Sequence, residues 1–217
     1  MAGSGQKLIA HDRRLGARHV AGADEAGRGS LAGPLVAAAV LLDLDTLRGR
    51  RAAAFAHLND SKQLEPDARE RLFHEVIRIA AGVAIEVVAP GEIDRSGLHR
   101  SNLRALATAL SRFEARADVF LVDGFRLGQA APPHSAIVDG DTKSAAIAAA
   151  SIVAKVTRDR AMRRLDAVYP TFGFASHVGY LTPAHSAAVR DRGPCELHRR
   201  SFNALCYAEQ DAAGVGP

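Results

Sequence analysis

The chain has 217 residues, of which 47% are hydrophobic and 24% are charged, the proportions of a soluble globular protein that is most economically one domain. Its 28 Lys and Arg residues against 24 Asp and Glu give a formal charge of +4, which permits a polyanionic partner without requiring one. Cys195 and Cys206 belong to no C-x-x-C pair, which excludes a disulfide framework and a thiolate zinc cluster.

No segment predicts secretion or membrane insertion. The basic N-terminus through His19 lacks the apolar stretch of a signal peptide, and the longest apolar run, Leu35–Leu42, is too short to cross a bilayer. We therefore expect a cytoplasmic protein with reduced cysteines and no membrane contact.

Strand and helix signals alternate along the chain, which predicts a mixed α/β domain. Two apolar segments, Val20–Asp24 and Leu35–Leu42, are expected as strands on either side of a glycine-rich loop. Pro66 begins a helix whose apolar residues recur every three or four positions until Gly82, and a strand follows at Val83–Ala89.

The second half continues the alternation. We expect a helix over Leu98–Ala115, short strands at Val119–Val122 and Ala136–Val138, and an alanine-rich helix over Lys143–Ala167. Beyond Thr171 turn residues become frequent and elements are not assigned. The first dozen residues and the tail from Gln210 to Pro217 are expected to be loose.

Acidic residues follow three of the predicted strands: Asp24 and Glu25, then Asp123, then Asp139 and Asp141. Ligand crevices of open α/β sheets form at such strand ends, and converging carboxylates repel one another unless a cation neutralises them. Magnesium binds through a few carboxylates. The alternative, that each acid only ends a strand or starts a turn as Asp-Gly often does, remains open.

The loop Gly27–Gly33 is one residue off the dinucleotide-binding fingerprint, which would indicate an oxidoreductase. That fingerprint needs a helix after the loop to hold a pyrophosphate, whereas Pro34 and an apolar strand follow here, and Asp24 and Glu25 would repel the phosphates. Glycines let a main chain approach a ligand closely, and Arg28 between two of them is a planar donor suited to phosphate.

Six motifs then follow one another in order. They are D-E-A-G-R-G with A-G-P at 24–34, N-D-S-K-Q-L at 59–64, L-V-D-G at 121–124 with G-D at 140–141, A-A-A-S-I-V-A-K at 148–155, H-V-G-Y-L-T-P-A-H at 177–185 and H-R-R-S-F at 198–202. Their sequences and order resemble those of the type 2 ribonuclease H family, ribonuclease HII. The resemblance covers roughly residues 20–202.

Three positions depart from the family pattern. Val178 and Leu181 stand where lysine and glycine are usual, which could thin nucleic-acid contacts or stiffen the turn at Tyr180. Asp139 occupies a place that is often basic, and it leaves a second acid beside Asp141. We choose Asp141 as the functional residue because it directly precedes the A-A-A-S-I helix.

The resemblance implies a ribonuclease H-like mixed β-sheet flanked by helices, with a helical C-terminal extension. We expect an N-terminal extension over residues 1–19, the catalytic domain with its helical region over 20–205, and a flexible tail over 206–217.

By resemblance, Asp24, Glu25, Asp123 and Asp141 form a four-carboxylate site for Mg²⁺ or Mn²⁺ that hydrolyses phosphodiesters with two metal ions. The expected substrates are the RNA strand of RNA–DNA hybrids and single ribonucleotides embedded in duplex DNA. The cut falls 5′ of the ribonucleotide and leaves 3′-hydroxyl and 5′-phosphate ends. The rival is a nucleic-acid-binding protein that kept the fold without the activity, against which the four intact acids argue.

The family also implies how the substrate is read. Gly27, Arg28 and Gly29 would meet the 2′-hydroxyl, the group that distinguishes RNA from DNA, and Tyr180 would contact the same hydroxyl and stack on the next sugar. Lys62 and Lys155 would contact phosphates, which fixes position but not sequence. Without the motifs around them, a tyrosine is more often half-buried packing, and a lysine is more often a solvated surface side chain.

The remaining signals are weaker. The basic stretch Lys155–Arg164 is either a phosphate contact or the solvated face of a helix, and Arg199 and Arg200 pose the same choice. His177, His185 and His198 lack a zinc-site spacing and are expected to serve structure. We expect a monomer, and the tail after Phe202 has room for a motif that binds a sliding clamp.

Overall fold

The computed structural model describes residues 4–58, 64–129 and 131–212. Its residues cluster into two units. The first, called the sheet unit, comprises Met1–Ala26, Val36–Glu86 and Asn102–Val156. The second, called the helical unit, comprises Gly27–Leu35, Val87–Ser101 and Thr157–Pro217.

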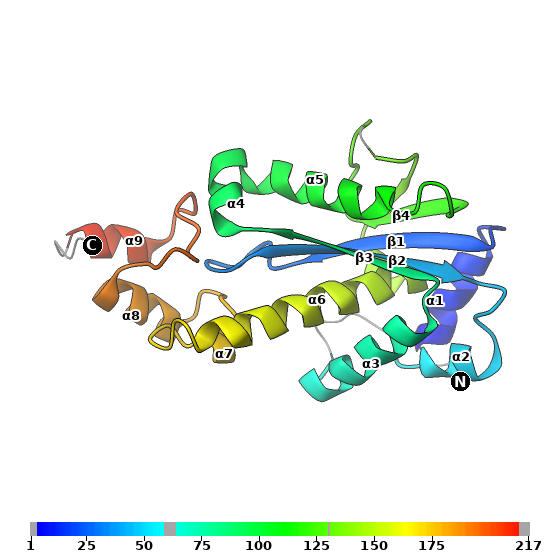
Figure 1. Ribbon diagram of the computed structural model, residues 1–217, viewed down its shortest axis with the longest axis horizontal. Helices are drawn as coiled ribbons and strands as arrows, with labels where there is room; N and C mark the ends of the chain where they lie inside the picture. Colours follow the sequence, from blue (N-terminus) through cyan, green and yellow to red (C-terminus); the bar gives the residue numbers. More distant parts are fainter. Residues whose placement is uncertain (1–3, 59–63, 130, 213–217) are drawn as a thin grey trace. The chain divides into compact units, whose positions relative to one another are not determined.

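A mixed five-stranded sheet of order β3-β2-β1-β4-β5 organises the sheet unit (Figure 1). All five strands expected from the sequence are present, as β1 (His19–Ala26), β2 (Leu35–Asp43), β3 (Gly82–Val88), β4 (Val119–Asp123) and β5 (Ser135–Ile137). β1 pairs antiparallel with β2 and parallel with β4, and β4 pairs parallel with β5. The carboxyl ends of β1, β4 and β5 therefore point the same way.

Helices cover both faces of this sheet. Within the sheet unit, α5 (Leu98–Ser111) lies over one face, and α1 (Ser4–Arg13), α3 (Pro66–Ile79) and α6 (Ala145–Asp166) lie on the other (Figure 1). The sequence did not predict the short helix α2 (Gly49–Ala54). All of its residues are at least partly exposed, so it has no buried apolar face from which a helix could be predicted.

Residues 4–13 form a helix, so the prediction that the first dozen residues are loose is wrong for residues 4–12. Ser4–Arg13 forms α1, whose Leu8 and Ile9 are buried in the main hydrophobic cluster beside strand and α6 residues. Only two large apolar side chains anchor this helix, too few for a periodic pattern to show.

Close approach of α6 to the sheet depends on small residues. A Cβ on Gly22 of β1 would lie 2.3 Å from the main-chain carbon of Ala146 and the nitrogen of Ile147. No real side chain can occupy that space. The alanine-rich face of α6 thus packs directly against β1, the strand that ends in Asp24.

The helical unit has a separate hydrophobic cluster. It is built around Leu31, Met162, Phe172, Phe174 and Val189. The helices within it that the sequence did not resolve are α4 (Pro90–Ser96), α7 (Phe174–His177), α8 (Pro183–Arg192) and α9 (Leu205–Ala212). Within the residues that the structure describes, no helix has the length and apolar character needed to cross a bilayer.

Candidate functional site

Two predicted acids stand side by side at the carboxyl edge of the sheet. The last paired residues of β1 and β4 are Ala23 and Val122, and the next residue on each strand is an aspartate, Asp24 and Asp123. Glu25 follows Asp24 on β1. The parallel pairing of the two strands therefore brings carboxylates from positions far apart in the sequence to one place.

Asp24 carries the electrostatic signature of a crowded carboxylate. Its side chain is only 6% exposed, and burial, followed by the charges of Glu25 and Asp123, raises its pKa well above the ordinary value. Hydrogen bonds from the Ser151 hydroxyl and from the Glu25 main-chain N–H oppose this rise in pKa. The sequence had assigned no role to Ser151, which lies on α6.

Asp141 and Asp139 occupy different environments. Asp139 is exposed and adopts a left-handed conformation with φ 52°, from which the short helix η1 (Gly140–Thr142) begins. Asp141 is buried within η1. Its neighbour Gly140 donates its N–H to Asp123 Oδ1 at 2.6 Å. Gly140 joins the two acids, so this bond does not distinguish them, but burial does: Asp141 is 7% exposed, whereas Asp139 is exposed.

The donor chemistry of these acids suits a hard divalent cation. Within the described ranges, no three His, Cys, Asp or Glu side chains form a ready-made metal site. Carboxylate oxygens are nevertheless the ligands that Mg²⁺ and Mn²⁺ prefer. A cation beside Asp24 and Asp123 would relieve the repulsion that, after burial, raises the pKa of Asp24. The residues present fit such an ion.

The glycine-rich loop lies in the helical unit, where a buried arginine shapes it. Arg158 is fully buried and donates to the carbonyl oxygens of Pro34, Ala32 and Val178 at 2.9, 3.0 and 2.8 Å. Gly27 has φ 85°, and a Cβ there would lie 1.9 Å from Arg158 Nε. The first glycine of the loop is therefore required by the guanidinium packed against it.

Arg199 holds the same loop from another side. It is also fully buried, and its guanidinium donates to the carbonyl oxygens of Arg28 and Gly33 at 3.0 to 3.1 Å. The sequence placed Arg158 and Arg199 among residues that bind phosphate or face solvent. Neither arginine binds phosphate or faces solvent. The guanidinium N–H groups of each donate instead to main-chain carbonyl oxygens inside the protein.

The loop connects two antiparallel strands rather than a strand and a helix. It leaves β1 after Ala26 and enters β2 at Leu35. This connection lacks the helix N-terminus of a dinucleotide site, so the structure supports rejecting the oxidoreductase alternative. At Gly29, by contrast with Gly27, a Cβ would meet no atom of the described residues within 4 Å.

Tyr180 is accessible, with 38% of its surface exposed. Its ring lies 5.6 Å from the Arg158 guanidinium carbon, and it follows a turn in which the buried Val178 adopts a left-handed conformation with φ 44°. Leu181 is 53% exposed beside it. Arg158 thus joins the carbonyls of the glycine-rich loop to the turn that carries Tyr180.

The two predicted lysines are less informative. Lys155 is partly exposed on α6, within the sheet unit. Lys62 lies outside the described residues. In the basic stretch, Arg163 and Arg164 are exposed, as expected for residues at the solvated end of α6.

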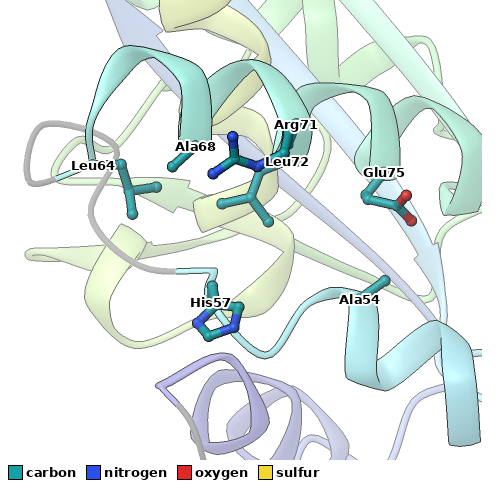
Figure 2. A pocket seen from close by; sticks show the side chains of 7 residues that line it. All are labelled: Ala54, His57, Leu64, Ala68, Arg71, Leu72 and Glu75. Atoms are coloured by element: carbon teal, nitrogen blue, oxygen red, sulfur yellow. The ribbon is translucent and has the colours of Figure 1, made fainter.

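A separate cavity of about 190 Å³ lies beside α3. Its lining comes from α2, α3 and the segments flanking the latter, and comprises Ala54, His57, Leu64, Ala68, Arg71, Leu72 and Glu75 (Figure 2). None of these residues belongs to the predicted site, so the cavity is not part of the candidate functional site.

Known proteins resemble the chain along most of its length. A family model described as Ribonuclease HII matches residues 21–205. The ribonuclease HII of Salinispora arenicola is 49% identical over 190 residues, which are 88% of this chain and 69% of that protein.

Two solved structures share the fold. The ribonuclease H2 of Pyrococcus horikoshii superposes with a TM-score of 0.75 at 27% identity, covering 91% of this chain and 100% of that one. The ribonuclease HII of Archaeoglobus fulgidus, solved in complex with PCNA, gives a TM-score of 0.72 at 26% identity, covering 85% and 95%.

Proposed function

The chain belongs to the ribonuclease HII family, and from this premise we propose that it hydrolyses the RNA strand of RNA–DNA hybrids and cuts 5′ of single ribonucleotides in duplex DNA. Family membership makes it a type 2 ribonuclease H, a metal-dependent phosphodiester hydrolase. We place its work in the cytoplasm, as a monomer, in DNA replication and ribonucleotide excision repair.

The observation that carries the proposal is the adjacency of Asp24 and Asp123 at the ends of parallel strands, with the pKa of Asp24 raised by burial and by neighbouring carboxylates. Glu25 and Asp141 complete the proposed set of ligands. Two Mg²⁺ or Mn²⁺ ions held there would supply an activated water and stabilise the leaving 3′ oxygen. Ser151 orients the Asp24 carboxylate through its hydroxyl.

Recognition of the 2′-hydroxyl is proposed for residues of the helical unit. The main chain of Gly27–Gly29 would approach the 2′-hydroxyl, for which Gly29 leaves open space. Tyr180, whose ring is accessible, would contact the same hydroxyl and stack on the next sugar. Lys62 and Lys155 would hold phosphates.

The test is cleavage of a labelled DNA duplex that contains one ribonucleotide, with Mg²⁺ or Mn²⁺. We expect a single cut 5′ of the ribonucleotide, a 3′ end that a DNA polymerase can extend, and no cutting of the matched all-DNA duplex. Asp123→Asn should lower kcat by at least about a hundredfold. Tight binding without cleavage in either metal would favour the non-catalytic alternative instead.

The chain offers a matched control for the fourth carboxylate. Asp139→Asn changes an exposed acid at a left-handed position that asparagine tolerates well, and it should cleave like the wild type. Asp141→Asn should lose activity as Asp123→Asn does. The opposite ranking would transfer the ligand role to Asp139.

A sliding clamp is the proposed protein partner, bound through the tail. The support is the Archaeoglobus relative, whose structure was solved with PCNA. The binding of a bacterial sliding clamp to the full chain, measured by calorimetry, should be lost in a chain ending at Ala212, where α9 ends. Retained binding would place the contact in residues 203–212 or outside the tail.

A further inference from the structure

Two buried histidines form a chain of hydrogen bonds that ends on the main chain of Tyr180. His185, on α8, is fully buried, and His198 is 2% exposed. Their Nε2 atoms lie 3.0 Å apart. His185 Nδ1 lies 2.9 Å from the Tyr180 carbonyl oxygen. On the far side, His198 Nδ1 lies 3.0 Å from the main-chain nitrogen of Cys195.

The hydrogen bond at Cys195 determines which atom donates and which accepts in each of these hydrogen bonds. The Cys195 N–H can only donate, so His198 Nδ1 must accept and the proton of that ring must be on Nε2. His198 Nε2–H then donates to His185 Nε2, which leaves the His185 proton on Nδ1. Nδ1–H donates in turn to the Tyr180 carbonyl, an obligate acceptor. Each step requires a neutral imidazole in one tautomer.

We propose that His185 and His198 are positioning residues, a neutral histidine relay that fixes the Tyr180 backbone for its contact with the ribonucleotide. The proposal rests on the proposed function for the substrate role of Tyr180. It goes beyond that function by assigning the two histidines a directional task, in which the tautomer of one determines that of the other.

The surroundings of the relay keep both rings uncharged. Burial lowers the pKa of His185, and burial together with His185 itself lowers that of His198 to about 4. The His177 ring stacks on His185 with centroids 4.3 Å apart, and the electrostatic influence of His177 lowers the pKa of His185 further. The titratable and charged groups that face the pair are His177, Tyr180, Cys195, Arg200 and Tyr207.

If the relay is correct, two different substitutions of His185 should lower kcat/KM by different amounts. In His185→Asn, the amide N–H stands near the place of Nδ1–H and can still donate to the Tyr180 carbonyl, whereas His185→Leu fills similar space without a donor. On the single-ribonucleotide duplex, His185→Leu should lower kcat/KM by about tenfold, the size of one lost hydrogen bond. His185→Asn should recover most of that loss. Equal losses in the two variants would overturn the relay.

Introducing His185→Leu into the Tyr180→Ala variant distinguishes an effect on substrate positioning from an effect on protein stability. In Tyr180→Ala, His185→Leu should lower kcat/KM no further, although it should lower the melting temperature as much as it does in the wild type. If Tyr180→Ala is impaired and His185→Leu still adds its full loss, the relay alone is wrong. If Tyr180→Ala cleaves like the wild type, the substrate role of Tyr180 fails and the relay falls with it.

The wild-type protein provides a test that needs no substitution. Long-range ¹H–¹⁵N correlation spectra of ¹⁵N-histidine-labelled protein at pH 7 should show His198 protonated on Nε2 and His185 protonated on Nδ1. Any other pair of tautomers, or a doubly protonated ring on either residue, would contradict the proposal.

Discussion

Asp12 accepts a hydrogen bond from the main-chain N–H of Ala146, 134 positions later in the sequence, at 3.0 Å. The same carboxylate oxygen accepts the Ser144 hydroxyl at 3.1 Å, and that hydroxyl in turn caps the N–H of Ile147. A buried residue of α1 thus satisfies the first turn of α6, where main-chain donors have no partner within the helix. The N-terminal helix therefore contributes to the framework of the carboxylate site.

Removing this anchor should destabilise the protein. Asp12→Ala leaves the Ala146 N–H buried without an acceptor and should lower the free energy of unfolding by about 1–3 kcal/mol. Ser144→Ala keeps the Ala146 bond and should cost about 1 kcal/mol, the value of a lost cap. Urea denaturation measures both. If Asp12→Ala costs no more than Ser144→Ala, the anchor is not the carboxylate.

The two outer glycines of the G-R-G segment should respond differently to alanine. Gly27 has φ 85° and no space beside Arg158, so Gly27→Ala should lower the melting temperature strongly. Gly29→Ala places its methyl group in open space and should melt like the wild type while losing affinity for ribonucleotide duplex. Thermal denaturation and KM separate the effects. A Gly29→Ala enzyme with unchanged KM would argue against contact between Gly29 and the substrate.

Arg158 should be needed for folding rather than for binding phosphate. Its guanidinium serves three carbonyls inside the protein, and Arg158→Lys cannot reach all of them because an ammonium lacks the planar fork. We expect a loss of about 3 kcal/mol in the free energy of unfolding. Arg163→Lys, at an exposed position of the same helix, should be neutral. Equal stability of the two variants would refute this role.

The burial of Arg158 and Arg199 marks the limit of what the sequence could predict. The strands were predictable because each is a short apolar run. The meeting of Asp24 with Asp123 was a reasonable expectation because parallel strands end at one edge. The acceptors of Arg158, in contrast, come from the loop at Ala32 and Pro34 and from the distant turn at Val178. No local pattern distinguishes such an arginine from a solvated one.

The histidine relay and α1 could not be predicted from the sequence for the same reason, because both depend on contacts between residues that are distant in the sequence. His185 and His198 meet only because the helical unit folds the chain between them back on itself. Single histidines in the sequence indicated a structural role but not a direction or an endpoint. Leu8 and Ile9 of α1 are too few to predict a helix, although tertiary burial of both stabilises it.

His198 predicts a pH dependence of stability. Burial, and then the neighbouring His185, lower its pKa from 6.5 to about 4. Between these values the unfolded chain binds a proton that the native protein excludes, so the free energy of unfolding should fall as pH drops from 6.5 toward 4. The contribution is at most about 3 kcal/mol. It should be missing from His198→Leu, whose stability, measured by urea denaturation, should depend less on pH over that range.

We expect the Asp24 carboxylate to destabilise the metal-free protein and to serve as a ligand when metal binds. Its buried carboxylate faces Glu25 and Asp123, and the raised pKa reports how unfavourable its charge is. Asp24→Asn removes that charge and should stabilise the metal-free protein by about 1–2 kcal/mol. Titration with Mn²⁺ should raise the melting temperature of the wild type but much less that of Asp24→Asn, because the variant has lost a ligand. Asp45→Asn, at an exposed acid paired with Arg48, should keep the full shift. If Asp24→Asn melts below the wild type without metal, repulsion among the carboxylates is too weak to matter, and the cation would be held for its chemistry alone.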